Sequence, residues 1–160
     1  MCTGVRFADA AGNLYFGRNL DWCESYGEGV VITPRGASIP TQFLGSLSPE
    51  HACVGMGIVV GGVPCYFDCA NEAGLAIAGL NFPGYAQFAE APEKGAVNVA
   101  AYEFPLWVAA SFSTVAEVRK ALKDVVIVAK APSEGYGVAQ LHWLVGDGKE
   151  LSLIHISEPT

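Results

Sequence analysis

Hydrophobic and polar positions alternate in short runs over the first half of the chain, and this pattern predicts β-strands. Residues 2–8 place Val5 and Phe7 between small or polar side chains, a period of two that is typical of a strand. The polar run 9–13 contains the residue types of a turn, and residues 14–17 predict a returning strand. The chain therefore opens with a predicted β-hairpin.

Further short apolar runs, rich in β-branched residues and bounded by Gly, Pro or Asn, predict additional strands. They are residues 30–33, 54–60, 65–68, 75–80, 125–128 and 141–145. Pro34 ends the first of these runs, and residues 71–74 predict a turn between two of them. Glycines recur inside several of the runs, which indicates close contact between neighbouring backbones.

The pattern changes in the third quarter of the chain, where two helices are predicted. Residues 98–111 are mostly apolar and contain no glycine, which predicts a helix that Pro105 kinks or interrupts. Thr114 and Glu117 have the spacing of a capping box, which predicts a second helix to about Lys123. Strands, then helices, then strands indicate a layered α+β fold rather than alternating βαβ units.

Composition and charge narrow the class of protein. The chain has 160 residues, 51% of them hydrophobic and 16% charged, which suits one folded domain. The net charge of −7 comes without any basic run, which argues against nucleic acid and anionic membranes as partners. The first 22 residues lack the pattern of a secretory signal, and glycines and prolines interrupt the uncharged run 73–89. We therefore expect a cytoplasmic protein that does not cross a membrane.

Five cysteines are present, and their spacing predicts neither a disulfide framework nor a zinc site. Cys2 is different from the others because it directly follows the initiator Met1. Removal of Met1 would leave a free α-amine beside the thiol, and α-amines exchange protons near neutral pH. One residue would then supply both a nucleophile and a base for acyl transfer. The alternative is that Cys2 is a small apolar side chain in a buried strand.

The run 16–22, Phe-Gly-Arg-Asn-Leu-Asp-Trp, adds charged residues to this region. The predicted hairpin returns this segment to the start of the chain, which places Arg18 and Asp21 near Cys2. The charge of Arg18 would favour a thiolate, and Asp21 could accept a hydrogen bond from the α-amine. The alternative is a surface Arg–Asp pair that contributes little.

Several motifs together resemble the choloylglycine hydrolase family, the bile salt hydrolases and penicillin V acylases among N-terminal-nucleophile hydrolases. The resemblance covers residues 2–149. The motifs that carry it are residues 1–4, 16–22, 71–75, 78–84, 104–107 and 141–143. It implies a four-layer αββα sandwich without a metal or organic cofactor. The second half of the family's sequence is missing, so a C-terminally truncated copy of the fold is expected.

The resemblance also implies roles for individual residues. Cys2 would be the nucleophile, Arg18 and Asp21 active-site residues, and Asn81 a donor to the oxyanion, a contribution of about 3–4 kcal/mol where such donors have been removed. Asn81 could instead be a plain turn residue. An apolar wall for a steroid would be formed by Leu20, Trp22, Val60, Phe67, Tyr136 and Leu141, for which ordinary core packing is the alternative. Cys23, Cys53, Cys65 and Cys69 are assigned to packing.

The implied substrate is a glycine- or taurine-conjugated bile acid, whose amide bond would be hydrolysed. Three alternatives remain open: penicillin V, against which Asn81 argues; an acyl-homoserine lactone or another linear amide; and a non-catalytic steroid-binding module. The resemblance further implies a homotetramer for the longer parent protein.

The last ten residues have a separate interpretation. Residues 151–160 resemble, at all ten positions, the in-frame translation of a transposon-derived sequencing adapter. We therefore expect the biological sequence to be residues 1–150, the N-terminal part of a single domain, and we assign no function to His155. The alternative is an apolar strand followed by a polar tail.

Overall fold

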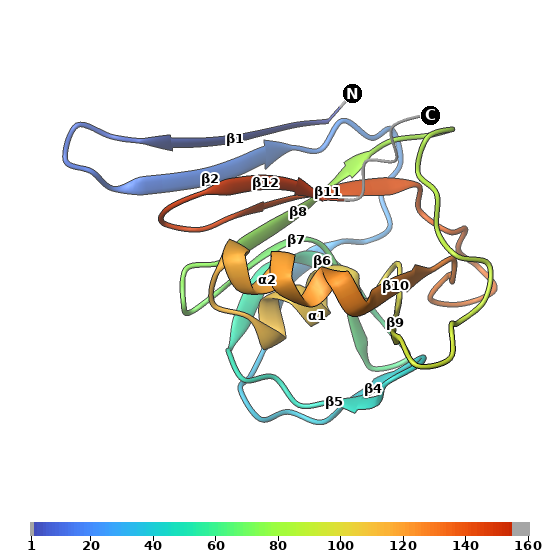
Figure 1. The fold of residues 1–160 in the computed structure, drawn as a ribbon. Helices are drawn as coiled ribbons and strands as arrows, with labels where there is room; N and C mark the ends of the chain where they lie inside the picture. The colour runs from blue at the N-terminus through green and yellow to red at the C-terminus, as the bar shows by residue number, and fades with distance from the viewer. Residues whose placement is uncertain (1, 155–160) are drawn as a thin grey trace.

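A computed structural model describes residues 2–154, and its central element is a six-stranded antiparallel sheet (Figure 1). The order of strands across the sheet is β12-β11-β8-β7-β6-β3. In chain order these are β3 (Gly29–Thr33), β6 (Cys53–Val60), β7 (Val63–Asn71), β8 (Ala76–Asn81), β11 (Leu141–Gly146) and β12 (Leu151–Ile154). Five of the six predicted apolar runs, all except residues 125–128, thus lie in one continuous sheet.

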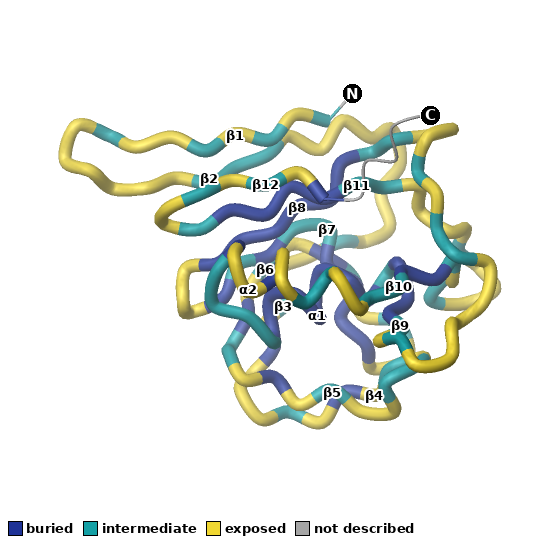
Figure 2. Tube along the Cα trace, viewed as in Figure 1, coloured by how far each residue is buried: buried dark blue, intermediate teal, exposed yellow. Residues whose placement is uncertain are grey.

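Helices α1 (Phe104–Ser111) and α2 (Val115–Ala121) cover one face of this sheet (Figure 1). Residues 104–110 of α1 are all buried, because α1 contacts β7 and β8 on one side and is enclosed on the others. The ring of Phe104 lies 4.6 Å from that of Trp143 in β11. Figure 2 shows the buried positions concentrated in α1 and the central strands, which form the hydrophobic core.

The hairpin of β1 (Thr3–Ala8) and β2 (Leu14–Asn19) lies on the opposite face of the sheet. Successive side chains of a strand point to opposite faces, so Leu144 points away from the helices that Trp143 contacts. A Cβ atom on Gly4 would collide with the Leu144 side chain, so β1 lies directly over β11. The described part of the chain therefore has three layers: helices, sheet and hairpin.

Two smaller strand pairs complete the described elements. Strands β4 (Ile39–Thr41) and β5 (Gly45–Leu47) are antiparallel, and β9 (Val97–Ala100) pairs in parallel with β10 (Val125–Val128). Sequence analysis did not predict β4, β5 or β9. The missed strands are short, three or four residues each.

The prediction of one helix over residues 98–111 is wrong. Its first residues form β9, and α1 begins only at Phe104. Pro105 lies in the first turn of α1, where a missing N–H costs nothing because that group has no partner within the helix. Pro105 therefore starts the helix instead of interrupting it.

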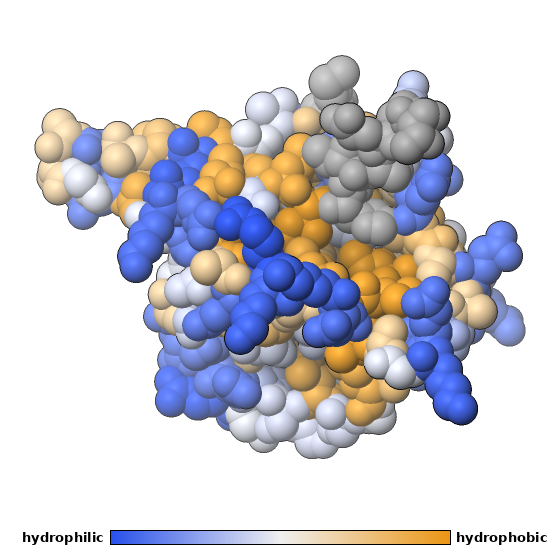
Figure 3. Space-filling model, viewed as in Figure 1, coloured by the Kyte–Doolittle hydropathy of each residue, from blue (hydrophilic) through white to orange (hydrophobic). Residues whose placement is uncertain are grey.

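The second predicted helix is confirmed. The Thr114 hydroxyl accepts a hydrogen bond from the Glu117 backbone N–H, and the Glu117 carboxylate accepts one from the Thr114 N–H, each at 3.2 Å. A short 3₁₀ turn, η1 (Leu122–Asp124), continues α2. Val118 is buried, while hydrophilic side chains gather over the outer side of α2 in the middle of the view (Figure 3). The capping box thus fixes where this amphipathic helix begins.

Apolar side chains remain exposed on the sheet face beside the hairpin. Val30 and Ile32 of β3 are 71% and 70% exposed, and Val54 and Met56 of the neighbouring β6 are also exposed. Since Val30 pairs with Met56 and Ile32 with Val54, the four form one patch.

Strand β12 falls within the segment that sequence analysis assigned to an adapter. Its four residues pair antiparallel with β11 from Gly146 to Trp143. His155 and the residues after it lie outside the described part of the chain. The assignment of residues 151–160 to an adapter stays a prediction.

Candidate active site

The register of the hairpin places Cys2 and Arg18 on the same face. Gly4 pairs with Arg18 and faces the sheet at Leu144. Because side chains alternate along a strand, Cys2, two residues before Gly4, is expected to face the sheet as well. Arg18 is then a diagonal cross-strand neighbour of Cys2, within reach of a long side chain. Cys2 is half-buried, which agrees with the expectation that it faces the space between hairpin and sheet.

Arg18 forms an ion pair with Asp68 of β7. The Arg18 Nε donates to Asp68 Oδ2 at 2.9 Å, and the Arg18 side chain is only 3% exposed. The Nη1 atom of Arg18 is buried and has no hydrogen-bond partner among residues 2–154. The alternative of a surface Arg–Asp pair is therefore wrong, because the guanidinium is enclosed between the layers. Asp21 is exposed and follows β2.

Sequence analysis missed Asp68, and the reason is a β-bulge. Met56 pairs with Asp68 and the next residue of β6 pairs with Tyr66, so Phe67 is an extra residue in β7. Tyr66 and Cys69 are three residues apart, yet both belong to the core on the helix side. The bulge accounts for this change of periodicity and turns Asp68 toward the hairpin.

The glycines of β6 permit a close approach of β7 at this point. A Cβ atom on Gly55 would collide with the carbonyl oxygen of Asp68 and lie 2.5 Å from the Cβ atom of Cys69. A Cβ atom on Gly57 would lie 2.5 Å from the carbonyl oxygen of Cys65. The prediction that strand glycines mark close backbone contacts is confirmed here.

Asn81 is the last residue of β8 and is half-buried. It pairs with Leu141, three residues before Leu144, over which Gly4 lies. The hairpin runs along β11 in the same direction, since the Arg6 side chain donates to the Asp147 carbonyl further on. Asn81 and the start of the hairpin therefore lie at the same end of the sheet.

His142 is a second residue near this end that sequence analysis included only in a motif. Its ring stacks on that of Phe82 with a centroid separation of 4.4 Å. Burial lowers the pKa of His142, and its Nδ1 has no hydrogen-bond partner among residues 2–154. The imidazole is therefore held in its neutral form at neutral pH.

Three of the predicted pocket residues form an aromatic cluster around Tyr26. The Tyr26 ring lies 6.1 Å from the rings of both Phe67 and Tyr136. The Trp22 Nε1 donates to the Tyr26 hydroxyl at 3.0 Å. Tyr26 itself was not predicted, since it lies in an exposed segment with no motif of its own. The cluster is a partly exposed apolar surface rather than part of the core.

The other predicted pocket residues have different surroundings. Leu141 lies beside Gly79, where a Cβ atom would be 3.1 Å from Leu141 Cδ1. Leu20 follows β2 and is 47% exposed, and Val60, the last residue of β6, is half-buried. Core packing is therefore wrong for Leu20, and equally for Trp22, which is 45% exposed.

The remaining cysteines divide into two groups. Cys53, Cys65 and Cys69 are buried as predicted, and burial raises the pKa of Cys53 to about 11 and of Cys65 to about 12. Such thiols stay protonated and unreactive at neutral pH. The prediction that Cys23 packs in the core is wrong, because Cys23 is exposed in the segment between β2 and β3.

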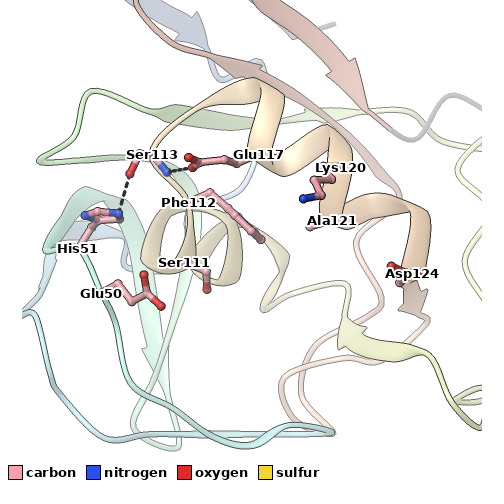
Figure 4. Close-up of a pocket in the computed structure, with 9 residues that line it drawn as sticks. All are labelled: Glu50, His51, Ser111, Phe112, Ser113, Glu117, Lys120, Ala121 and Asp124. Atoms are coloured by element: carbon pink, nitrogen blue, oxygen red, sulfur yellow. Dashed lines mark hydrogen bonds between the residues drawn. The ribbon is translucent and has the colours of Figure 1, made fainter.

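Two surface cavities lie away from these residues. One, of about 420 Å³, lies beside α1 and α2, and there Ser113 Oγ is 3.0 Å from His51 Nε2 (Figure 4). The other, of about 280 Å³, lies near Tyr15 and Asp147. None of the predicted site residues lines either cavity. Among residues 2–154, no group of three or more His, Cys, Asp or Glu could hold a metal, and no helix is long and apolar enough to span a membrane.

Comparison with curated proteins finds close relatives over nearly the whole chain. The bile salt hydrolase/transferase of Bifidobacterium longum is 55% identical over 93% of this chain and 47% of its own length. The conjugated bile acid hydrolase of Lactobacillus gasseri is 51% identical over 99% of this chain and 50% of its own length. The chain thus spans about half the length of the curated relatives it matches.

Solved structures show the same fold. The conjugated bile acid hydrolase of Clostridium perfringens, in its C2A and R18L variants, matches all of this chain with TM-scores of 0.88 and 0.87. The sequence identities are 32% and 30%, and the match covers 54% of each of those chains. Penicillin V acylase from Agrobacterium tumefaciens shares the fold at a TM-score of 0.72 and 18% identity. The architecture is therefore that of the N-terminal-nucleophile hydrolases.

The family comparison agrees with these relatives. The family model of linear amide C–N hydrolases, choloylglycine hydrolase family, matches residues 2–159. The match includes the hairpin with Cys2 and Arg18 and the strands that carry Asp68 and Asn81. The chain therefore belongs to the choloylglycine hydrolase family.

Proposed function

We propose that this chain is part of a bile salt hydrolase that cleaves the amide bond of glycine- or taurine-conjugated bile acids. The observation that carries the proposal is the enclosed Arg18, whose Nη1 has no partner among residues 2–154 and which lies on the hairpin face expected for Cys2. Relatives named for bile acid hydrolysis are 51–55% identical, and a more distant one, from Clostridium perfringens at 30–32% identity, has solved structures with substitutions at a Cys2 and an Arg18. A nucleophilic thiol beside a cation is suited to acyl transfer.

The proposed reaction begins after removal of Met1. The Cys2 thiolate attacks the amide carbonyl carbon, and the carbonyl oxygen becomes an oxyanion that Asn81 and backbone N–H groups stabilise. The C–N bond breaks, and the protonated α-amine of Cys2 gives its proton to the departing glycine or taurine nitrogen. Water then attacks the thioester, loses a proton to the α-amine and releases the bile acid from Cys2. Arg18 favours the thiolate, and Asp21 orients the α-amine.

The aromatic cluster around Tyr26 supports a steroid substrate. Trp22, Phe67 and Tyr136 present rigid apolar surfaces with one hydroxyl at their centre. Ligand sites for large apolar molecules are built mainly from such side chains, with few polar anchors. We propose that the cluster forms one wall of the steroid pocket, with Leu20, Val60 and Leu141 contributing to its borders.

The length of the relatives and the charge of the chain support our proposals on the second half, the assembly and the partners of the enzyme. The relatives are about twice as long, and we propose that the active enzyme includes a corresponding second half and assembles as a homotetramer. The uncovered patch on β3 and β6 supports this, since Val30 and Ile32 are more than two-thirds exposed. The net charge of −7 without a basic run supports an enzyme without nucleic-acid or membrane partners, and we propose a cytoplasmic location.

Amine release from glycocholate, taurocholate and penicillin V tests the proposal. The chain is compared with a version extended by the second half of the Lactobacillus gasseri relative, and the intact mass of each shows whether Met1 is removed. Cys2→Ser is expected to lower bile salt turnover at least 100-fold, whereas Cys23→Ser, at an exposed cysteine outside the site, is expected to have no effect.

Three results would contradict the proposal. Preferential cleavage of penicillin V would make the protein a penicillin acylase. Cleavage of other linear amides or acyl-homoserine lactones instead of all three compounds would change the substrate class. Steroid binding without turnover, unaffected by Cys2→Ala, would make it a binding module.

A further inference from the structure

Asp68 lies beside the proposed site without a role in the reaction as described above. It is a partly exposed carboxylate on an otherwise mostly apolar strand, and its Oδ2 accepts a hydrogen bond from Arg18 Nε at 2.9 Å. The two residues are 50 positions apart in the sequence. The contact therefore depends on how the hairpin layer sits on the sheet.

The ion pair leaves part of the guanidinium unused. Asp68 occupies Nε of Arg18, while Nη1 is buried and has no partner among residues 2–154. A buried donor without a partner costs about 1–3 kcal/mol, so such groups are usually paired with a protein group, ordered water or a ligand. The guanidinium is planar and rigid, so fixing Nε also fixes the direction of Nη1. Asp68 thus decides where the unused donor points.

The backbone around Asp68 is built to hold it in place. The bulge at Phe67 directs the carboxylate toward the hairpin, and Gly55 lets the Asp68 backbone approach β6 more closely than any side chain would allow. A side chain with such a constrained backbone can orient its partner with little freedom. Arg18 is therefore anchored to the rigid sheet and not only to its own hairpin.

We propose that Asp68 is a positioning residue, which holds Arg18 at Nε so that Nη1 is presented to Cys2 and the bound amide. The proposal deepens the proposed function, on which it rests for the role of Cys2. Asp68 itself touches neither the substrate nor the thiol in this scheme, and it acts only through Arg18.

Replacing Asp68 by Asn should change the alkylation of Cys2 and the turnover of substrate in opposite directions, the first through charge and the second through orientation. The loss of the negative charge leaves Arg18 uncompensated, which favours the Cys2 thiolate and raises its reactivity toward a small alkylating reagent. The loss of the ion pair also frees the guanidinium, and misplacing a group by about 1 Å can lower turnover about 100-fold. A merely structural role would instead change both rates by the same factors whether or not Arg18 is present.

The test measures both rates in a Cys23→Ser background, which removes the other accessible thiol. The alkylation of Cys2 by iodoacetamide is followed in the chain itself, and bile salt turnover in whichever of the chain and its extended form is active. For Asp68→Asn we expect kcat to fall about 100-fold with KM within about twofold. We expect alkylation to rise about threefold. Asp124→Asn, the same change at an exposed position in η1, is the control and should alter neither rate.

A double-mutant cycle separates positioning from a direct role. In an Arg18→Leu background, Asp68→Asn should change either rate less than twofold, because Asp68 acts only through Arg18. Should Asp68→Asn fail to fold, Asp68→Glu replaces it, since it keeps the charge and displaces the guanidinium by one methylene. It is expected to lower kcat about tenfold and leave alkylation unchanged.

The outcomes distinguish the inference from the proposed function. Equal effects of Asp68→Asn with and without Arg18, or a parallel fall of both rates, would overturn the positioning role. If no form hydrolyses a bile salt, the proposed function fails, while the alkylation cycle still decides whether Asp68 acts through Arg18. Coupling between Asp68 and Arg18 in the alkylation cycle would then support the positioning role of Asp68 but not the proposed function.

Discussion

The close contact between β6 and β7 beside Asp68 can be tested most directly at Gly55. A Cβ atom there would lie 2.5 Å from the Cβ atom of Cys69 and closer still to the Asp68 carbonyl oxygen, whereas ordinary contact begins at roughly 3.4 Å. Both neighbours belong to the backbone or its first atom in β7, so no rotamer change can make room. Gly55→Ala must therefore move β7 away from β6 by about 1 Å, at a cost near the upper end of overpacking, about 3 kcal/mol.

Urea denaturation followed by circular dichroism measures this cost, and Gly29→Ala is the matched control. Gly29 lies in β3, which pairs with β6, and a Cβ atom there meets nothing within 4 Å. Gly29→Ala should leave the free energy of unfolding unchanged or raise it by up to about 1 kcal/mol, because alanine restricts the unfolded chain. Gly55→Ala should lower the free energy of unfolding by about 3 kcal/mol and, in thermal unfolding of the same samples, the Tm by about 6–12 °C. Equal unfolding free energies for the two variants would refute the argument from close backbone contact.

Three further perturbations have defined outcomes. Burial raises the pKa of Glu103, so its folded state holds the proton more tightly than the unfolded state, and stability should fall as pH rises from about 4 through the raised pKa. Glu103→Gln should remove this slope in unfolding experiments between pH 4 and pH 8. Thr114→Ala removes the side-chain acceptor of the capping box and should lower the unfolding free energy by about 1 kcal/mol, whereas Ala116→Ser on the exposed side of α2 should change it little. Native-state alkylation mapped by mass spectrometry should modify Cys2 and Cys23 and none of the buried cysteines, and labelling of a buried thiol at the same rate would contradict the core described here.

The elements that local sequence determines were predicted well. The capping box of Thr114 and Glu117 and the hairpin turn at residues 9–13 depend on contacts within five residues, and both are present. The apolar run 98–111 was misassigned because apolar segments alone do not distinguish a buried strand from a buried helix. Pro105 was the available signal, since proline in the first helical turn is common and proline inside a helix is rare.

The candidate site was predicted only as far as its residues lie close together in the sequence or in a known motif. The hairpin could be inferred from pattern, and it places Cys2 near Arg18. Asp68 and Tyr26 could not, because each meets its partners through the packing of layers or of an exposed segment. The one sequence signal for Asp68 was a lone Asp in an apolar strand. The face of the sheet on which its side chain lies depends on a β-bulge, which the alternation of apolar and polar residues does not reveal.

The layered arrangement also explains why stability and chemistry should be linked in this molecule. The hairpin carries Cys2 and Arg18, while the sheet carries Asp68 and Asn81, so the proposed site requires the two layers to be in register. Small residues allow both parts of this arrangement, since Gly4 lets the hairpin lie on Leu144 of the sheet and Gly55 lets β7, which carries Asp68, lie close to β6. A substitution at either glycine should therefore displace Asp68 relative to Arg18 before it unfolds the chain. Loss of coupling between the layers, rather than loss of any single side chain, is then the most direct way to inactivate the proposed site.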